Sequence, residues 1–194
     1  MILDDKFWNE RWQSDDTQWD IGYPAPAIVN FIETIKDKSI RILIPGCGNA
    51  YEAEYLHNNG FTNVYVLDYA AEALRRFGVR VPSFPEEHLL QCDFFQLENG
   101  KFDLVLEQTF FCAIDPSLRK NYEAKMTELL NENGMIAGLL FIQTPNSEGP
   151  PFNGSIDEYR ELFGKRFNIR KMEVCKNSIK PREGREVWFE VVRK

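Results

Sequence analysis

Two short polar segments, each directly after a run of apolar residues, carry the first chemical signal in the sequence. Residues 40–44 (IRILI) lead into the sequence PGCG, which contains Gly46 and Gly48, and residues 64–67 (VYVL) lead into Asp68. A glycine turn lets a ligand approach the bare backbone, whose free N–H groups point toward it. A carboxylate that ends the next strand can accept hydrogen bonds from both hydroxyls of a ribose. The pair therefore predicts a pocket for an adenosine-containing ligand.

A third apolar run ends in Cys92-Asp93-Phe94, which suits the base of the same ligand. Asp93 can accept a hydrogen bond from the exocyclic amine of adenine, and Phe94 can cover the face of the ring. Each of these residues also has a purely structural explanation when taken alone. Many tight turns need glycine, Asp68 could cap the following helix, and Asp93 could lie in a solvated loop. The combination after consecutive strands favours the ligand.

The glycine turn also separates two kinds of adenosine ligand. A dinucleotide site needs a third glycine so that the helix can pack closely while a pyrophosphate lies at its N-terminus. The sixth position counted from Gly46 is Tyr51. S-adenosylmethionine carries no phosphate and needs only the close backbone approach, so the turn favours this ligand over NAD.

These residues must be positioned by an alternation of strands and helices. The expected strands are short and apolar and lie at 40–44, 64–67, 88–91, 102–106 and 135–142. The expected helices have apolar residues at helical spacing and lie at 51–58, 70–76, 116–130 and 155–163, with the Asn133-Gly134 turn ending the third of these. Alternating residues at 167–174 and 186–192 predict a terminal antiparallel pair. We therefore expect one α/β domain over residues 1–194, with a mostly parallel seven-stranded sheet and a C-terminal antiparallel hairpin.

Charge and composition exclude several functional classes. With 23 basic and 30 acidic residues among 194, the formal net charge is −7, which disfavours nucleic acid as a partner. No apolar run approaches the roughly 20 residues of a membrane span, and residues 1–20 lack the pattern of a signal peptide. The four cysteines have no metal-ligand spacing and are expected to be reduced thiols. We expect a cytoplasmic monomer without a metal ion.

Four features together resemble a known family. They are residues 44–48 (IPGCG), 102–114 (FDLVLEQTFFCAI), the Asn133-Gly134 turn before a long apolar strand, and 149–152 (GPPF), and the likeness covers nearly the whole chain. They resemble the thiopurine S-methyltransferase family, and most closely its thiol, thiocyanate and halide methyltransferase branch. The resemblance implies a class I, Rossmann-like methyltransferase fold with S-adenosylmethionine as cofactor. It further implies methyl transfer to a small nucleophile, namely a thiol, bisulfide, thiocyanate or halide, and next a thiopurine-like thiol.

The resemblance also implies cofactor contacts, with an N-terminal aromatic segment, residues 1–38, acting as a lid. The implied contacts are the lid residues Trp8, Trp12 and Trp19, Gly46 for the methionine end, Asp68 for the ribose, Asp93 and Phe94 for the adenine, and Gln108. A tryptophan face attracts a sulfonium by roughly 0.5 to 2 kcal/mol, although core packing explains Trp12 nearly as well. Gln108 departs from the tyrosine or arginine that the family often has there, and it lacks a positive charge for the methionine carboxylate.

Methyl transfer from a sulfonium to an anion destroys charge in the transition state, so a closed apolar pocket favours it without a dedicated base. Phe111, Phe141 and Phe152 follow the relevant strands and are expected to line the acceptor site. We assign no catalytic residue, and His57 and His88 are expected to be structural.

Two other functions share part of this pattern. A NAD(P)-dependent oxidoreductase would have the same glycine turn and ribose carboxylate, and it would be protected by NAD rather than by S-adenosylhomocysteine in a thermal shift experiment. A non-catalytic protein would bind S-adenosylmethionine without methylating any nucleophile.

Overall fold

A single seven-stranded sheet organises the chain in the computed structural model, which describes residues 2–98, 100–144 and 149–194. The strand order is β3-β2-β1-β4-β5-β7-β6. The strands are β1 (Ile42–Pro45), β2 (Val64–Asp68), β3 (Leu89–Gln91), β4 (Phe102–Gln108), β5 (Leu130–Phe141), β6 (Phe167–Val174) and β7 (Glu186–Arg193). The first five pair in parallel, and β7 is antiparallel to both β5 and β6. The predicted α/β sheet with a terminal hairpin is confirmed.

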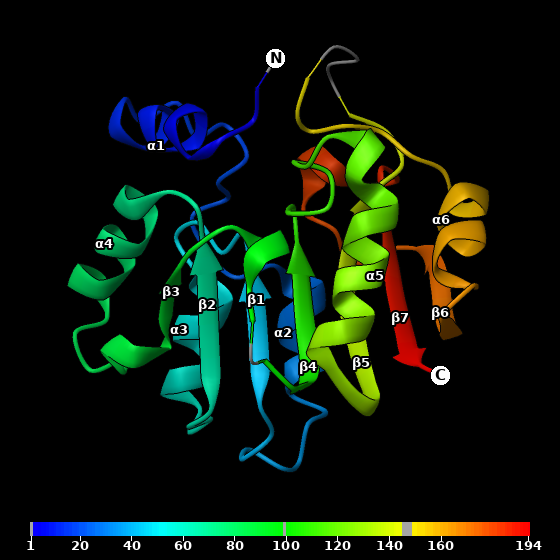
Figure 1. Cartoon of the computed structure of the whole chain (residues 1–194), viewed down its shortest axis with the longest axis horizontal. Helices are drawn as coiled ribbons and strands as arrows, with labels where there is room; N and C mark the ends of the chain where they lie inside the picture. Colours follow the sequence, from blue (N-terminus) through cyan, green and yellow to red (C-terminus); the bar gives the residue numbers. More distant parts are fainter. Residues whose placement is uncertain (1, 99, 145–148) are drawn as a thin grey trace.

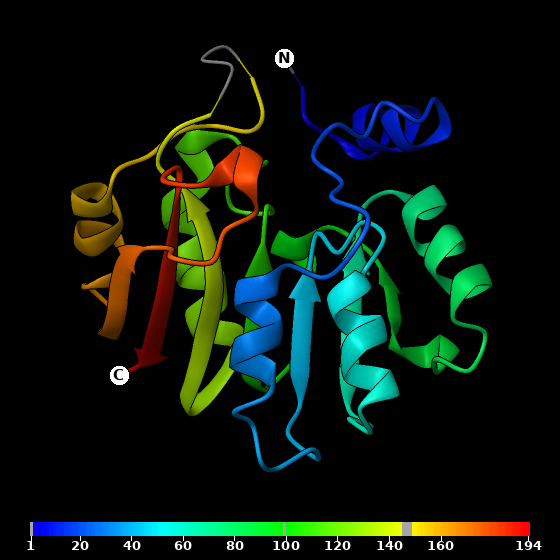
Figure 2. The same cartoon turned by 180° about the vertical axis from the view of Figure 1, so that it is seen from behind.

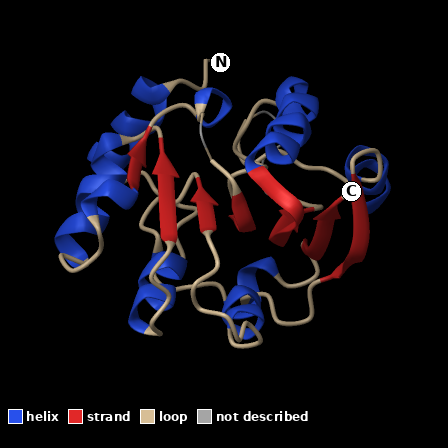
Figure 3. Cartoon of the chain, turned by 60° about the horizontal axis from the view of Figure 1, so that its bottom comes forward, coloured by secondary structure: helices blue, strands red, loops and turns tan. Residues whose placement is uncertain are grey.

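Helices cover both faces of this sheet (Figures 1, 2 and 3). They are α1 (Asp5–Gln13), α2 (Pro26–Ile32), α3 (Tyr51–Asn58), α4 (Ala71–Arg80), α5 (Arg119–Leu129) and α6 (Ile156–Phe163). One buried cluster joins the sheet to α2, α3 and α4, and a second joins it to α5 and α6. The sheet therefore has a hydrophobic core on each side.

Strand β1 is apolar at every position because both of its faces are buried. In β1, Ile42 and Ile44 belong to the core under α2, α3 and α4, whereas Leu43 belongs to the core under α5 and α6. The exposed fraction of each of these three side chains is 2% or less. Strands β1, β2 and β4 come from separate parts of the sequence and lie side by side in the sheet.

The carboxyl ends of β1, β2 and β4 lie at one edge of the sheet, where an open α/β sheet binds its ligand. Helix α1 lies above that edge and packs against α4 (Figure 1). Its N-terminus is capped by Asp4, whose carboxylate accepts from the Phe7 N–H at 2.9 Å. The N-terminal segment is therefore placed where it can face a ligand.

The structure differs from the sequence prediction in two places. It adds helix α2, whose buried residues pack in the sheet core. Helix α5 ends at Leu129, and β5 begins at Leu130, so Asn133 and Gly134 lie inside the strand rather than after the helix. Asn133 has a φ of 61°, which gives the chain a local kink. Within the described ranges, the structure contains no helix that is both long and apolar enough to cross a membrane.

Candidate cofactor and acceptor site

The glycine turn after β1 takes the left-handed backbone that its sequence predicts. Gly46 and Gly48 have φ values of 57° and 53°, and Ala50, at the cap position of α3, has 51°. A Cβ atom at Gly46 would overlap with the Phe110 ring, and one at Gly48 would lie 2.9 Å from the Trp12 ring. The rings of Phe110 and Trp12 therefore approach this backbone so closely that only glycine fits at the two positions.

Asp68 holds the turn and faces the same pocket. Its Oδ2 accepts from the Gly48 N–H at 2.8 Å, and its Oδ1 accepts from the Ala70 N–H at 2.9 Å. Burial raises the pKa of the Asp68 carboxyl, and the backbone N–H groups around it oppose the rise. Each carboxylate oxygen keeps a second lone pair, so hydrogen bonds to ribose hydroxyls are still available.

The predicted adenine residues also line the pocket. Asp93 begins a short 3₁₀ helix (Phe94–Gln96), where its Oδ1 accepts from the Phe95 N–H at 2.8 Å. The Tyr69 hydroxyl also hydrogen-bonds to Asp93, and burial together with this carboxylate raises the pKa of Tyr69. Phe94 is buried and packs against Phe110 with 5.1 Å between ring centroids. Asp93 therefore already has protein partners, which leaves fewer of its lone pairs for a ligand.

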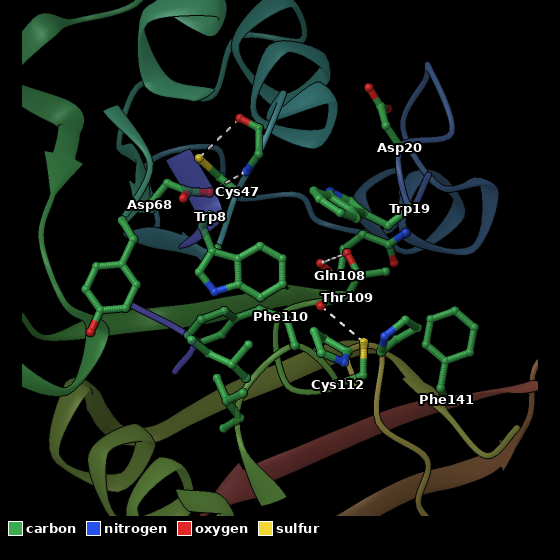
Figure 4. A pocket seen from close by; sticks show the side chains of 18 of the residues that line it. Trp8, Trp19, Asp20, Cys47, Asp68, Gln108, Thr109, Phe110, Cys112 and Phe141 are labelled. Atoms are coloured by element: carbon green, nitrogen blue, oxygen red, sulfur yellow. Dashed lines mark hydrogen bonds between the residues drawn. The ribbon is translucent and has the colours of Figure 1, made fainter. Parts of the chain in front are cut away.

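The three tryptophans gather into one cluster beside the glycine turn. The rings of Trp8 and Trp19 meet edge to face at 5.5 Å, and those of Trp12 and Trp19 at 5.9 Å. Trp12 is buried against Ala70 and Ala73, whereas Trp8 and Trp19 are half-buried. All three line the pocket (Figure 4 labels Trp8 and Trp19), and their contact with a cofactor stays a prediction.

Hydrogen bonds from opposite sides of the pocket fix the segment that carries these rings. On α4, the Arg76 guanidinium donates to the Trp12 carbonyl at 2.6 Å and pairs with Asp15 at 2.8 Å. Asn49, in the glycine turn, donates to Asp20 at 2.5 Å. From the C-terminal part of the chain, Arg182 donates to the Trp19 carbonyl at 2.6 Å.

The loops after β4 and β5 form the other side of the pocket, which we call the acceptor half. Its lining is mostly apolar and includes Cys112, Ala113, Ile114, Phe141, Pro150 and Pro151. Phe141 also carries the Arg182 guanidinium 5.2 Å from its ring centroid, and Arg182 pairs with the buried Glu186 at 3.4 Å. Among the described lining residues there is no histidine or lysine. Figure 4 shows Cys112 and Phe141 across the pocket from Asp68.

Two residues expected in the acceptor site lie elsewhere. Phe111 is fully buried in the core, where its ring packs against Tyr122 and Tyr159, so it does not line the pocket. Phe152 lies just beyond the two lining prolines, and its N–H donates to the Cys112 carbonyl at 2.7 Å. Its backbone thus joins the loops after β4 and β5, whereas its ring is not among the described lining groups. The sequence could not separate these rings because all of them follow strand ends.

Gln108 lies at the end of β4 and lines the pocket. Its Oε1 is buried and has no hydrogen-bond partner within the described part of the chain. A buried amide oxygen without a partner costs free energy, and a ligand group in the pocket would remove that cost. This placement agrees with the predicted cofactor contact.

Sequence reasoning missed Glu107, the neighbour of Gln108. Its side chain is fully buried, and its carboxylate accepts from the Phe110 and Phe111 N–H groups and from the Tyr122 hydroxyl. The available signal was an acidic residue directly after the apolar run Leu104-Val105-Leu106 of the strand sequence FDLVLEQ, at a position where a buried strand would continue. Buried carboxylates of this kind are uncommon and tend to occur near functional sites.

The residues on this pocket fit S-adenosylmethionine. The volume is about 1060 Å³, which exceeds what one drug-sized ligand usually needs and leaves room for a small second molecule. Gly46 and Gly48 line the pocket with their backbone, with Phe110 and Trp12 filling the side on which a Cβ would lie. Asp68 can hold a ribose, and Gln108 offers an unpaired polar atom. An aromatic cluster lies beside them.

Comparison with known proteins identifies the family. The family model for thiopurine S-methyltransferase matches residues 3–192. The chain is 32% identical over 185 residues to a probable thiol methyltransferase 2 of Arabidopsis thaliana, covering 92% of this chain and 81% of the relative. It is 29% identical over 184 residues to thiocyanate methyltransferase 1 of Brassica oleracea, with the same coverage. It is 26% identical to a thiopurine S-methyltransferase of Marinobacter nauticus, covering 88% and 86%.

Solved structures agree on the fold. A Burkholderia thailandensis 1,6-didemethyltoxoflavin-N1-methyltransferase with bound S-adenosylhomocysteine aligns with a TM-score of 0.78 at 14% identity, covering 98% of this chain and 87% of that one. A magnesium protoporphyrin IX methyltransferase from Synechocystis with bound S-adenosylmethionine aligns with a TM-score of 0.75 at 12% identity, covering 100% and 99%. Sheet order, glycine turn and family match lead to one conclusion: the chain belongs to the thiopurine S-methyltransferase family of S-adenosylmethionine-dependent methyltransferases.

Proposed function

We propose that this enzyme methylates a small, soft nucleophile, namely a thiol, bisulfide, thiocyanate or halide, and with lower preference a thiopurine-like thiol. The observation that carries the proposal is the division of the pocket. One half offers a glycine turn and Asp68, whereas the acceptor half is mostly apolar and, although Asp115 and Arg182 also line the pocket, offers no histidine or lysine among its described residues. The names of the plant relatives support the same substrate class.

When bound, S-adenosylmethionine supplies a methyl group on a positively charged sulfur. The proposed reaction forms one bond from the acceptor sulfur or halide to that methyl carbon and breaks the bond from the carbon to the sulfonium. The donor's electron pair stays on the departing S-adenosylhomocysteine, and a thiol acceptor gives its proton to solvent. Apolar side chains such as Phe141 and Ile114 exclude water, which would otherwise stabilise the separated charges more than the transition state.

The cofactor contacts are part of this proposal. Gly46 receives the methionine end beside Gln108, Asp68 holds the ribose, and Asp93 with Phe94 surrounds the adenine. Trp8, Trp12 and Trp19, in the N-terminal lid segment predicted at residues 1–38, lie over the donor sulfur. Close positioning of donor and acceptor supplies the rate enhancement. Among the described lining residues there is no histidine or lysine, and Asp115, the carboxylate of the loop after β4, already accepts from the Ser117 N–H and hydroxyl.

Turnover experiments with several acceptors test the proposal. The enzyme is incubated with S-adenosylmethionine and, separately, with hydrosulfide, a short alkyl thiol, thiocyanate, iodide or 6-mercaptopurine, and methylated products are measured. We expect turnover with the small acceptors to exceed that with 6-mercaptopurine. Binding of S-adenosylhomocysteine without any product would indicate a non-catalytic protein. Thermal protection by NAD alone would indicate an oxidoreductase, which the family match does not favour.

We further propose that the protein acts as a cytoplasmic monomer on small molecules rather than on nucleic acid. The net charge of −7 supports the second point because an acidic surface repels a phosphate backbone. Light scattering at micromolar concentration tests the oligomeric state, and an electrophoretic mobility assay with RNA and DNA tests nucleic-acid binding.

A further inference from the structure

Glu107 is a buried carboxylate that joins three parts of the fold. It is the next-to-last residue of β4, and its exposed fraction is 0%. Its Oε1 accepts from the backbone N–H groups of Phe110 at 2.8 Å and Phe111 at 2.9 Å. Its Oε2 accepts from the hydroxyl of Tyr122 on α5 at 2.7 Å, and Tyr122 is itself fully buried. The carboxylate thus ties the turn after β4 to a helix of the core.

The turn that Glu107 holds forms part of the pocket. Thr109 has a φ of 61°, an uncommon value for a residue other than glycine, directly after β4 ends. The ring of Phe110 then lies directly against Gly46 and contacts Phe94. The N–H groups of Phe110 and Phe111 both donate to the same oxygen of Glu107. These two hydrogen bonds hold the Phe110 ring at the glycine turn.

The surroundings make this carboxylate costly to ionise. Burial raises the pKa of Glu107 to about 7, against hydrogen bonds from Phe111, Tyr122 and Phe110 that lower it. In the described ranges no lysine, arginine or histidine lies within ion-pair distance of it.

Among the described residues, the titratable side chains that face Glu107 are neutral between pH 6 and 8.5. The Tyr122 hydroxyl on α5, the Cys112 thiol after the turn and the Tyr159 hydroxyl on α6 all have raised pKa values, because they are buried. From β5 the facing residue is Gly138, where a Cβ atom would overlap with the Glu107 carbonyl. Glu107 is thus the group of this cluster that titrates near neutral pH.

We propose that Glu107 is a positioning residue for methyl transfer, whose carboxylate fixes the 109–111 turn and so holds the Phe110 ring against the part of the glycine turn that receives the methionine end. An apolar side chain would fill this site at a lower desolvation cost, but it would leave the Phe110 and Phe111 N–H groups buried without a partner. The inference rests on the proposed cofactor placement, because it links Glu107 to cofactor binding through Phe110.

The ionised form holds the turn best, since hydrogen bonds to a charged acceptor are stronger than those to a neutral one. Below the pKa of Glu107 the neutral acid still accepts from the two N–H groups, but less strongly. Cofactor affinity should therefore fall as the pH drops through the pKa of Glu107. Glu107→Gln keeps a neutral acceptor of the same shape and removes the titration.

Calorimetry with S-adenosylhomocysteine between pH 6 and 8.5 tests the inference. We expect wild type and Glu107→Gln to bind equally at pH 6 and the variant to bind about fivefold more weakly at pH 8.5. Dividing the dissociation constant of the variant by that of wild type at each pH removes contributions from other carboxylates, such as Asp68. A ratio of dissociation constants close to one at every pH would overturn the inference, whereas a constant ratio well above one would support the positioning role and place the titration of Glu107 outside this range.

A second variant keeps the test valid if Glu107→Gln does not fold. Tyr122→Phe leaves the carboxylate in place but removes a hydrogen bond that favours its ionised form. The pH at which affinity changes should therefore move upward, and an unchanged midpoint would count against the inference.

The control is Glu123→Gln, on the same helix. Glu123 is buried and pairs with Arg166 at 3.1 Å, but it does not line the pocket, so its change should leave affinity and pH profile as in wild type. Wild type that binds no S-adenosylhomocysteine at any pH would instead contradict the proposed function.

Discussion

At the scale of single residues, Asp68 performs two tasks with one carboxylate. It accepts from the Gly48 and Ala70 N–H groups, and it lines the pocket where a ribose is expected. We predict that Asp68→Ala weakens binding of S-adenosylhomocysteine by about 1 to 3 kcal/mol, because charge-assisted hydrogen bonds are lost. Titration calorimetry measures this. The control is Asp157→Ala, whose side chain is 96% exposed, and equal affinities for the two variants would remove Asp68 from the site.

Gly48 allows a separate test of the contact with the tryptophan cluster. Gly48→Ala must adopt a φ of 53° and places a methyl group 2.9 Å from Trp12, whereas Gly184→Ala adopts a φ of 71° with no atom within 4 Å. Both variants should lose roughly 1 kcal/mol of unfolding free energy from backbone strain. Only Gly48→Ala should also bind S-adenosylhomocysteine more weakly. Urea denaturation and calorimetry measure the two effects, and equal affinities would show that the Trp12 position does not affect binding.

The residues that face the pocket were predictable where they follow a strand end. Gly46, Asp68 and Gln108 all line the pocket because the ends of parallel strands meet at one edge. Phe111 could not be assigned, since whether a ring after a strand points into the pocket or the core depends on the turn. Glu107 sets that turn, and its role depends on backbone N–H groups that no sequence pattern displays.

At the scale of elements, α1 depends on α4 for its position. Arg76 binds both the Trp12 carbonyl and Asp15, whereas its neighbour Arg75 pairs with Glu72 alone among the described side chains. We predict that Arg76→Ala weakens cofactor binding by about 1 kcal/mol and makes the tryptophans more accessible to a fluorescence quencher. Arg75→Ala removes an equivalent charge and should change neither the cofactor affinity nor the quenching of the tryptophans. Similar quenching in both variants would contradict a lid held by Arg76.

Strongly patterned elements were predictable, and weakly patterned ones were not. Helix α3 runs from Tyr51 to Asn58 as expected, because apolar spacing and the Asn59-Gly60 stop agree. Helix α2 has only seven residues, so its period is too short to detect, although its buried face is part of the core. The start of β5 was misplaced because Asn133-Gly134 usually ends a helix, whereas here it kinks a strand.

At the scale of the whole molecule, Glu107 should lower stability as the pH rises. Its pKa is about 7 in the folded protein and 4.5 ordinarily, so the folded state holds the proton more tightly. The free energy of unfolding therefore falls as the pH increases from about 4.5 to 7, by on the order of 3 kcal/mol from this group, and is then constant. Glu107→Gln should remove this loss.

Urea denaturation at pH 5 and pH 8 measures the effect. The stability of Glu107→Gln relative to wild type should increase between the two pH values. Burial also raises the pKa values of Asp68, Glu52 and Glu186, but these groups are common to both proteins and cancel in the difference. A difference that is the same at both pH values would show that Glu107 titrates in its ordinary range.

Two sulfur atoms of the protein itself line this pocket. Cys47 and Cys112 are free thiols, and loss of hydration raises the pKa of each. The Cys112 Sγ–H donates a hydrogen bond to the Thr109 carbonyl at 3.1 Å, and this hydrogen bond favours the protonated thiol. Because only a thiolate is a good nucleophile, we predict that a cofactor bound in this pocket does not methylate these cysteines. After prolonged incubation with S-adenosylmethionine, its intact mass should show no added methyl group.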